Sequence, residues 1–184
     1  MRRDALWKRL DVPGHDAAEI TETDAGALLK GVAVLHENGH PARLSYEVRL
    51  ASDWSATSGH ISGFYGGEPV DTRIERRADG WYLNDVFQGL IELVDLDFGF
   101  TPATNMPQLR RFNLADGETA DVNVAWYDIG VEQLVVLPQI YRRIDARSYA
   151  YDSPTADYHA TLTIAPSGFV QDYPELWVME PVGV

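Results

Sequence analysis

The sequence predicts an all-β fold, in which a single antiparallel sheet curves into a half-open barrel with at most short helices. Three segments, residues 43–50, 121–126 and 158–164, alternate apolar and polar side chains. This period of two is typical of half-buried antiparallel strands. Turn signals such as Asn38-Gly39 and Asp116-Gly117 separate the alternating segments. Regularly spaced short strands with such turns favour a sandwich, a barrel or a curved sheet.

Each alternating segment has one apolar face, which we expect to point inward. The inward residues are Leu44, Tyr46, Val48 and Leu50 in the first segment, Val122, Val124 and Trp126 in the second, and Tyr158, Ala160, Leu162 and Ile164 in the third. No long window carries a helical apolar stripe, and the best candidate for a short helix is the stretch Pro102–Arg111.

The stretch Gln139–Tyr151 differs from these strands because both of its faces are mixed. Interpreted as one strand, it places Tyr141, Tyr149 and Tyr151 on the same face as Arg143, and the opposite face carries Arg142 among apolar residues. A closed barrel filled by its own side chains requires a cleaner apolar face, whereas a half-open barrel tolerates this one. The five tryptophans and nine tyrosines suit walls that are partly apolar and partly wet.

Length and composition indicate one globular domain spanning residues 1–184, with 45% hydrophobic and 23% charged residues. The absence of cysteine excludes disulfides, thiolate metal sites and cysteine nucleophiles. A formal net charge of −13 argues against a nucleic-acid partner and against docking on anionic lipid through a basic patch. No window approaches the roughly 20 apolar residues of a membrane span, so stable membrane insertion is not expected. No signal-peptide core is present either, which leads us to expect a cytoplasmic location.

The segment His36-Glu37-Asn38-Gly39-His40 matches the zinc metalloprotease pattern H-E-x-x-H. That chemistry needs a helix, because two histidines one turn apart must face one metal ion. Asn-Gly is instead the strongest short hairpin signal, and Pro41 follows directly. The sequence therefore predicts a hairpin turn here and no metal site, and no other motif indicates a cofactor or a catalytic residue.

The segment from Asp95 to Arg111 concentrates opposite charges beside two prolines. Asp95 and Asp97 share a face if the stretch is extended, and such a pair could bind a metal or act in acid–base chemistry. The interpretation that we favour is that they neutralise Arg110 or Arg111 in a buried network. A third possibility is that one arginine stays free to meet an anionic or hydroxyl-rich ligand.

Several of these residues together resemble a bacterial family known as "putative glycolipid-binding", formerly a domain of unknown function. The resemblance covers nearly the whole chain. Its most specific parts are the block Thr101-Pro102-Ala103-Thr104-Asn105 with Pro107 and Arg110-Arg111, and the terminal block Tyr173-Pro174 with Leu176-Trp177. Such a resemblance implies an antiparallel sheet curled into a half-barrel over an apolar cavity, similar to lipoprotein carriers.

The leading hypothesis from the sequence is a binding protein for an amphipathic, lipid- or glycolipid-like molecule in a cavity of about 300–1,000 Å³. The alternatives are a small-molecule isomerase or hydrolase that uses Asp95 or Asp97 with Arg110, and a structural or interaction module without a ligand. Candidate ligand-binding residues are Tyr46, Val48, Trp54, Val124 and Trp126 for the apolar part, and Asp95, Asp97, Thr104, Asn105, Arg110, Arg111, Gln139, Tyr141, Tyr149 and Tyr151 for the polar part. The oligomeric state is left open.

Overall fold

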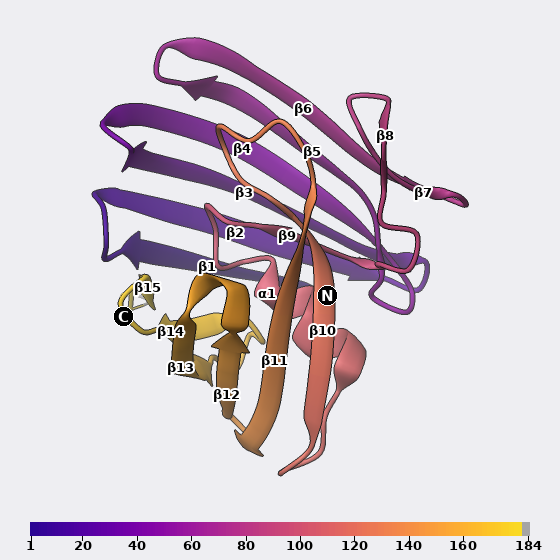
Figure 1. Ribbon diagram of the computed structural model, residues 1–184. Coiled ribbons are helices and arrows are strands. Elements are labelled where there is room, and N and C mark those ends of the chain that lie inside the picture. Colours follow the sequence, from indigo (N-terminus) through magenta and orange to yellow (C-terminus); the bar gives the residue numbers. More distant parts are fainter. Residues whose placement is uncertain (182–184) are drawn as a thin grey trace.

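Fifteen strands form one curved sheet that does not close into a barrel (Figure 1). The computed structural model describes residues 1–181. The strands follow one another in space in the order β8-β7-β6-β5-β4-β3-β2-β1-β15-β14-β13-β12-β11-β10-β9. The all-β class and the curved, open sheet predicted from the sequence are therefore confirmed.

The strands of the first half, β1–β8, form an antiparallel meander in which each strand pairs with the next. Their bounds are β1 Arg2–Arg9, β2 Gly14–Thr23, β3 Gly26–Glu37, β4 His40–Ala51, β5 Ala56–Tyr65, β6 Glu68–Arg77, β7 Gly80–Leu83 and β8 Val86–Gly89.

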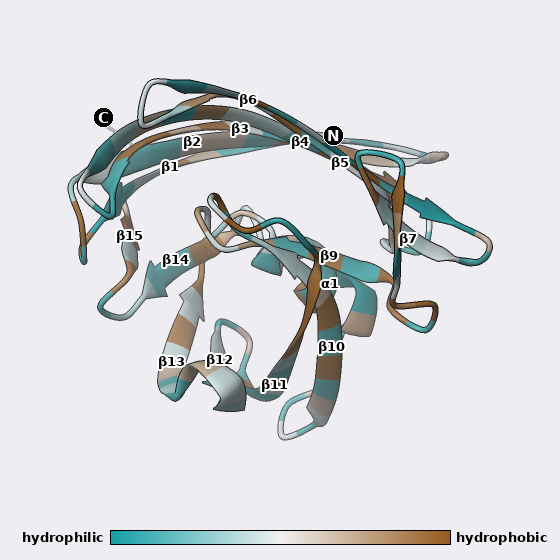
Figure 2. Cartoon of the chain, turned by 45° about the horizontal axis from the view of Figure 1, so that its top comes forward, coloured by the Kyte–Doolittle hydropathy of each residue, from teal (hydrophilic) through white to brown (hydrophobic). Residues whose placement is uncertain are grey.

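The elements of the second half curl beneath the first half, as Figure 2 shows, and β1 joins the two halves by pairing with β15. Their bounds are β9 Asp95–Phe98, α1 Asn105–Phe112, β10 Thr119–Tyr127, β11 Val135–Asp145, β12 Ser148–Ser153, the 3-10 helix η1 Pro154–Ala156, β13 Tyr158–Ile164, β14 Val170–Tyr173 and β15 Trp177–Met179.

The pairing is antiparallel throughout the described residues except at one edge, where β9 pairs parallel with β10. The chain passes through α1 between these two strands, and a parallel pair needs such a crossover connection.

In α1, Pro107 occupies the first turn. Backbone N–H groups in this turn have no partner within the helix, so proline, which lacks an N–H, is tolerated there. The helix ends at Phe112, and Asn113 caps it in a left-handed conformation, with its N–H donating to the carbonyl of Leu109.

The segment that matches the zinc pattern forms a hairpin turn, as the sequence predicts. Asn38 and Gly39 both have positive φ, at 49° and 82°, as a tight two-residue hairpin requires. The strands pair His36 with Pro41 and Glu37 with His40. Because directly paired residues share a face and adjacent residues do not, the two histidines lie on opposite faces of the sheet.

The stretch Gln139–Tyr151 is two strands and not one, which corrects the interpretation from its sequence. The turn lies between Asp145 and Ser148 and carries no glycine or proline. Tyr141 pairs with Tyr151 across the resulting hairpin, and their ring centroids are 4.9 Å apart.

Two clusters of buried apolar side chains stabilise this arrangement. The larger cluster lies between the first half and the β9–β10 edge of the second, and the smaller one lies inside the curl of the second half. The approach between β5 and β9 is close, since a Cβ on Gly59 would lie 2.6 Å from Cδ2 of Leu96. A residue without a side chain is therefore needed at this point of β5.

Candidate functional site

An ion pair fixes the geometry of the segment between β9 and the end of α1. The Arg111 guanidinium donates to both carboxylate oxygens of Asp95, from Nε at 2.9 Å and from Nη2 at 2.5 Å. Asp95 is buried, and the Arg111 side chain is 24% exposed. The predicted pairing of one of the two aspartates with one of the two arginines is thus confirmed, and a two-pronged contact of this kind is geometrically specific.

Asp97 lies on the same face of β9 but has only neutral hydrogen-bond donors. The Thr104 hydroxyl donates to its Oδ1 at 2.5 Å, and the Gln139 amide donates to its Oδ2 at 2.8 Å. Burial raises the pKa of the Asp97 carboxyl because the charged form loses its hydration. Asp97 is therefore a buried acid without a cationic partner within residues 1–181.

A second group of polar side chains continues from Asp97 toward α1. The Tyr141 hydroxyl accepts from Asn105 Nδ2 at 2.8 Å and lies 2.9 Å from Gln108 Oε1 and 3.1 Å from Gln139 Oε1. Tyr141 has one proton to donate, so it serves one of these two oxygens at a time. Burial raises the pKa of Tyr141, which keeps it neutral.

A cavity of about 590 Å³ opens beside these groups, inside the curl of the second half. Its volume falls within the range expected for a small-molecule site. Asp97, Thr101 and Asn105 supply buried polar groups, and the exposed residues Val136 and Thr155 lie where the cavity meets solvent. The remaining wall is mainly aromatic and aliphatic: Phe98, Trp126, Val135, Leu137, Tyr151, Tyr158, Tyr173, Leu176 and Trp177.

The tyrosines of this wall pack against one another. The ring centroids of Tyr151 and Tyr173 are 5.6 Å apart, and those of Tyr158 and Tyr173 are 5.5 Å apart. The Tyr158 hydroxyl donates to the Pro174 carbonyl at 2.6 Å, which anchors this ring at the side of the cavity. Burial raises the pKa of Tyr158 to about 12, so the wall carries no phenolate at neutral pH.

Ser153 also lines the cavity, and its hydroxyl is a polar group that lacks a partner. The residue is only 3% exposed, and its Oγ has no hydrogen-bond partner among the described residues. Unpaired buried hydroxyls are uncommon because each one costs free energy. The Tyr151 hydroxyl lies beside this oxygen in the cavity wall.

The candidate residues from the sequence divide into three sets. Asp97, Asn105, Trp126 and Tyr151 line the cavity. Thr104, Gln139 and Tyr141 contact these polar groups from behind the cavity surface. The remaining candidates lie elsewhere: Tyr46 and Val48 in the larger core cluster, Val124 and Tyr149 in the smaller one, Asp95 and Arg111 in their ion pair, and Trp54 and Arg110 beside each other.

Arg110 is directed away from the cavity. Its guanidinium lies over the ring of Trp54, 5.1 Å from the centroid, and its Nη2 is 3.6 Å from a carboxylate oxygen of Glu22. The side chain is 46% exposed. The combination of Arg110 with Asp95 or Asp97, on which the sequence-based enzyme hypothesis depends, is not assembled.

Among the cavity-lining residues that were not candidates from the sequence are Thr101, Ser153, Tyr158, Tyr173 and Trp177. Thr101, Tyr173 and Trp177 belong to the two blocks that carry the family resemblance, so a signal was present. Ser153 carried no signal, because a single serine after a strand is unremarkable.

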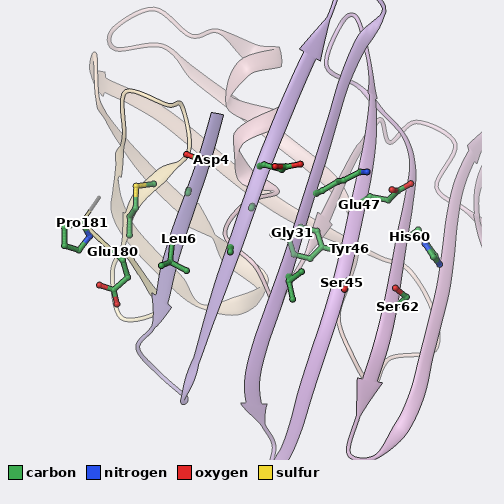
Figure 3. A pocket seen from close by; sticks show the side chains of 17 residues that line it. Asp4, Leu6, Gly31, Ser45, Tyr46, Glu47, His60, Ser62, Glu180 and Pro181 are labelled. Atoms are coloured by element: carbon green, nitrogen blue, oxygen red, sulfur yellow. The ribbon is translucent and has the colours of Figure 1, made fainter. Parts of the chain in front are cut away.

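A second hollow, of about 800 Å³, crosses the face of β1–β5 that points away from the second half (Figure 3). Small residues such as Ala17 and Ser45 form its floor, and charged residues such as Glu47 and His60 border it. It is open to solvent, and no unpartnered buried polar side chain faces it among the described residues. The cavity of the second half, with its buried polar groups, is therefore the better candidate site.

Residues 1–181 contain no group of three or more histidine, aspartate or glutamate side chains placed to hold a metal ion. None of the helices in this part of the chain has the length and apolar character needed to cross a membrane.

Comparison with known proteins places this geometry in a family. A comparison with curated proteins finds no match. The crystal structure of a DUF1089 family protein from Pseudomonas aeruginosa is similar in fold, with a TM-score of 0.72 and 23% sequence identity over 97% of this chain and 91% of that one. The family described as "putative glycolipid-binding" matches residues 4–178. This match spans most of the chain, which therefore belongs to that family.

Proposed function

We propose that this protein binds an amphipathic small molecule, lipid- or glycolipid-like, in the cavity of its second half. The observation that carries the proposal is the combination, in one cavity of about 590 Å³, of an aromatic and aliphatic wall with buried polar groups at one side. Ligand sites have this composition, in which apolar walls supply affinity and a few polar groups fix orientation. The family description supports the same class of ligand.

The distribution of polarity suggests how such a ligand is oriented. Asp97 and Asn105 are 6% and 3% exposed, whereas Thr155, which also lines the cavity, is exposed to solvent. A hydrogen-bonding head group fits beside the two buried polar residues, and an apolar chain fits along the aromatic and aliphatic wall toward solvent.

One observation favours a second candidate function, acid–base catalysis on a small molecule. Asp97 combines a raised pKa with a position in a cavity, and such groups occur preferentially at active sites. Arg110 has no part in this version, because it lies beside Trp54. Turnover of a bound ligand that is lost in Asp97→Asn, while binding persists, would support it.

The binding proposal is tested with an environment-sensitive fluorescent lipid probe. We expect saturable binding to the parent protein and clear weakening in Trp126→Ala, which removes a ring from the cavity wall. Trp54→Ala is the matched control, since Trp54 contacts Arg110 and does not line the cavity. Absence of saturable binding, or equal effects of the two substitutions, would overturn the proposal.

A further inference from the structure

We propose that the cavity selects an amphiphile whose polar end is cationic, an amine or a quaternary ammonium group, held against Asp97 and enclosed by aromatic rings. This inference rests on the proposed function and specifies the charge of its ligand.

The first observation is that the Asp97 carboxyl lacks a counter-charge. Its two hydrogen bonds come from a hydroxyl and an amide, both neutral. The nearby arginines are already engaged, Arg111 by Asp95 and Arg110 by Glu22 and the Trp54 ring. A buried acid without a cationic partner is shifted toward its neutral form, as the raised pKa of Asp97 shows, and a bound cation would favour the charged form instead.

Asp95 provides an internal comparison two residues away on the same strand. Asp95 has a cationic partner in Arg111 and does not line the cavity, whereas Asp97 has none and does. The aspartate outside the cavity thus has an arginine partner, whereas the aspartate that lines the cavity has no cationic partner among the described residues. A bound ammonium group would give Asp97 the partner that Arg111 gives Asp95.

The second observation concerns the aromatic side chains of the same cavity. Trp126, Tyr151, Tyr158, Tyr173 and Trp177 all line the cavity. Ring faces attract cations, and several rings around one site form the cage by which proteins recognise quaternary ammonium groups. Burial raises the pKa of Tyr151 and Tyr173, so these phenols stay neutral and add no competing charge.

Other head groups fit these observations less well. An anionic head would meet the Asp97 carboxyl without a cation to offset the repulsion. A neutral head such as a sugar could hydrogen-bond to Asp97 and Asn105, but it would leave Asp97 without a counter-charge. Coulomb attraction in a partly buried site is worth several-fold more than in bulk water, which favours the cation.

The experiment compares three amphiphiles that share a decyl chain: decyltrimethylammonium, decyl glucoside and decanoate. Each is titrated below its aggregation concentration and followed by calorimetry and by tryptophan fluorescence, because Trp126 and Trp177 line the cavity. We expect the cationic probe to bind roughly tenfold or more tightly than the glucoside, and decanoate to bind most weakly.

The matched variants are Asp97→Asn and Asp128→Asn. Asp128 also has a raised pKa, about 6, but does not line the cavity, so its substitution removes a nearby negative charge without changing the wall. Asp97→Asn should bring the affinity for the cationic probe down to that for the glucoside. Asp128→Asn should still bind the cationic probe more tightly than the glucoside. Equal losses of this preference in both variants would mean that it comes from the negative charge of the whole protein, and the inference would be overturned.

A further pair of variants keeps the test decisive if Asp97→Asn does not fold. Tyr158→Leu removes a ring face from the wall, and Tyr158→Phe keeps the ring while losing the bond to Pro174. If Tyr158→Leu loses the preference for the cationic probe and Tyr158→Phe keeps it, the result supports recognition of the cation by the aromatic rings. Equal binding of cationic and neutral probes by the parent protein overturns the inference and leaves the proposed function standing, whereas no binding of any probe overturns both.

Discussion

The ring of Tyr46 lies across Gly31, the residue that pairs with it on the neighbouring strand. A Cβ on Gly31 would lie 2.2 Å from the Tyr46 Cζ, so only a glycine admits the ring. The ring thereby crosses β3 and its hydroxyl donates to Asp16 on β2 at 2.8 Å. The Thr101 hydroxyl donates to the same carboxylate oxygen at 2.5 Å, which links the first half of the sheet to a residue of the cavity wall.

We therefore expect Gly31→Ala to destabilise the protein by about 2 kcal/mol or more, since overpacking a core costs roughly 1–3 kcal/mol and the Asp16 hydrogen bond is lost as well. Urea unfolding measures the change. The control introduces Gly31→Ala into a Tyr46→Leu background, where the ring is absent and the added methyl should cost much less. Equal costs in the two backgrounds would show that the ring does not depend on Gly31.

Asp16 gives a prediction about pH. Burial raises the pKa of Asp16 to about 6, above the ordinary value of roughly 3.9. The folded state thus binds the proton more tightly than the unfolded state does. The stability that the protonated group contributes is fully present below pH of about 4 and is lost as the pH rises through about 6, a loss of about 3 kcal/mol.

Asp16→Asn keeps a hydrogen-bond acceptor for Tyr46 and Thr101 but cannot titrate. From pH 4 to pH 7, the free energy of unfolding of the parent should fall by about 2 kcal/mol more than that of the variant. Chemical unfolding at the two pH values provides the measurement. Parallel pH dependence in parent and variant would mean that the Asp16 carboxyl titrates normally.

The two aspartates of β9 should respond differently to the same substitution. Asp95→Asn leaves Arg111 without its charge partner, and we expect a loss on the order of 3 kcal/mol, the lower end for a buried pair because Arg111 is partly exposed. Asp97→Asn breaks no ion pair and should cost clearly less. Thermal and urea unfolding of both variants tests this order, and a larger loss for Asp97→Asn would contradict the assignment of the pair.

The hairpin at Asn38-Gly39 predicts that the segment His36–His40 binds no zinc. His36 and His40 lie on opposite faces of the sheet, so one tetrahedral ion cannot contact both. Metal analysis of protein purified without chelators should find no stoichiometric zinc. Zinc at one equivalent that disappears in His36→Ala would require a different local structure.

The sequence predicted the strand class well, because period-two alternation depends on each strand alone. It could not separate Arg110 from Arg111, because adjacent helical residues point about 100° apart and only the packing of α1 decides which one meets Asp95. The hairpin within Gln139–Tyr151 was not predicted, because the turn at Ala146-Arg147 carries neither glycine nor proline. The pairing of β1 with β15 has no local signal, since it joins residues about 170 positions apart.

That pairing makes the fold a candidate for circular permutation. The sheet order is β9 to β15 followed by β1 to β8, so a chain that began at β9 and ended at β8 would visit every strand in strictly neighbouring order. Strands β15 and β1 lie side by side in the middle of the sheet. Most other strand pairs are local hairpins, whereas the pairing of β1 with β15 joins residues about 170 positions apart. A permuted chain would turn that slow, distant closure into one more hairpin and should fold faster, because local contacts form before distant ones.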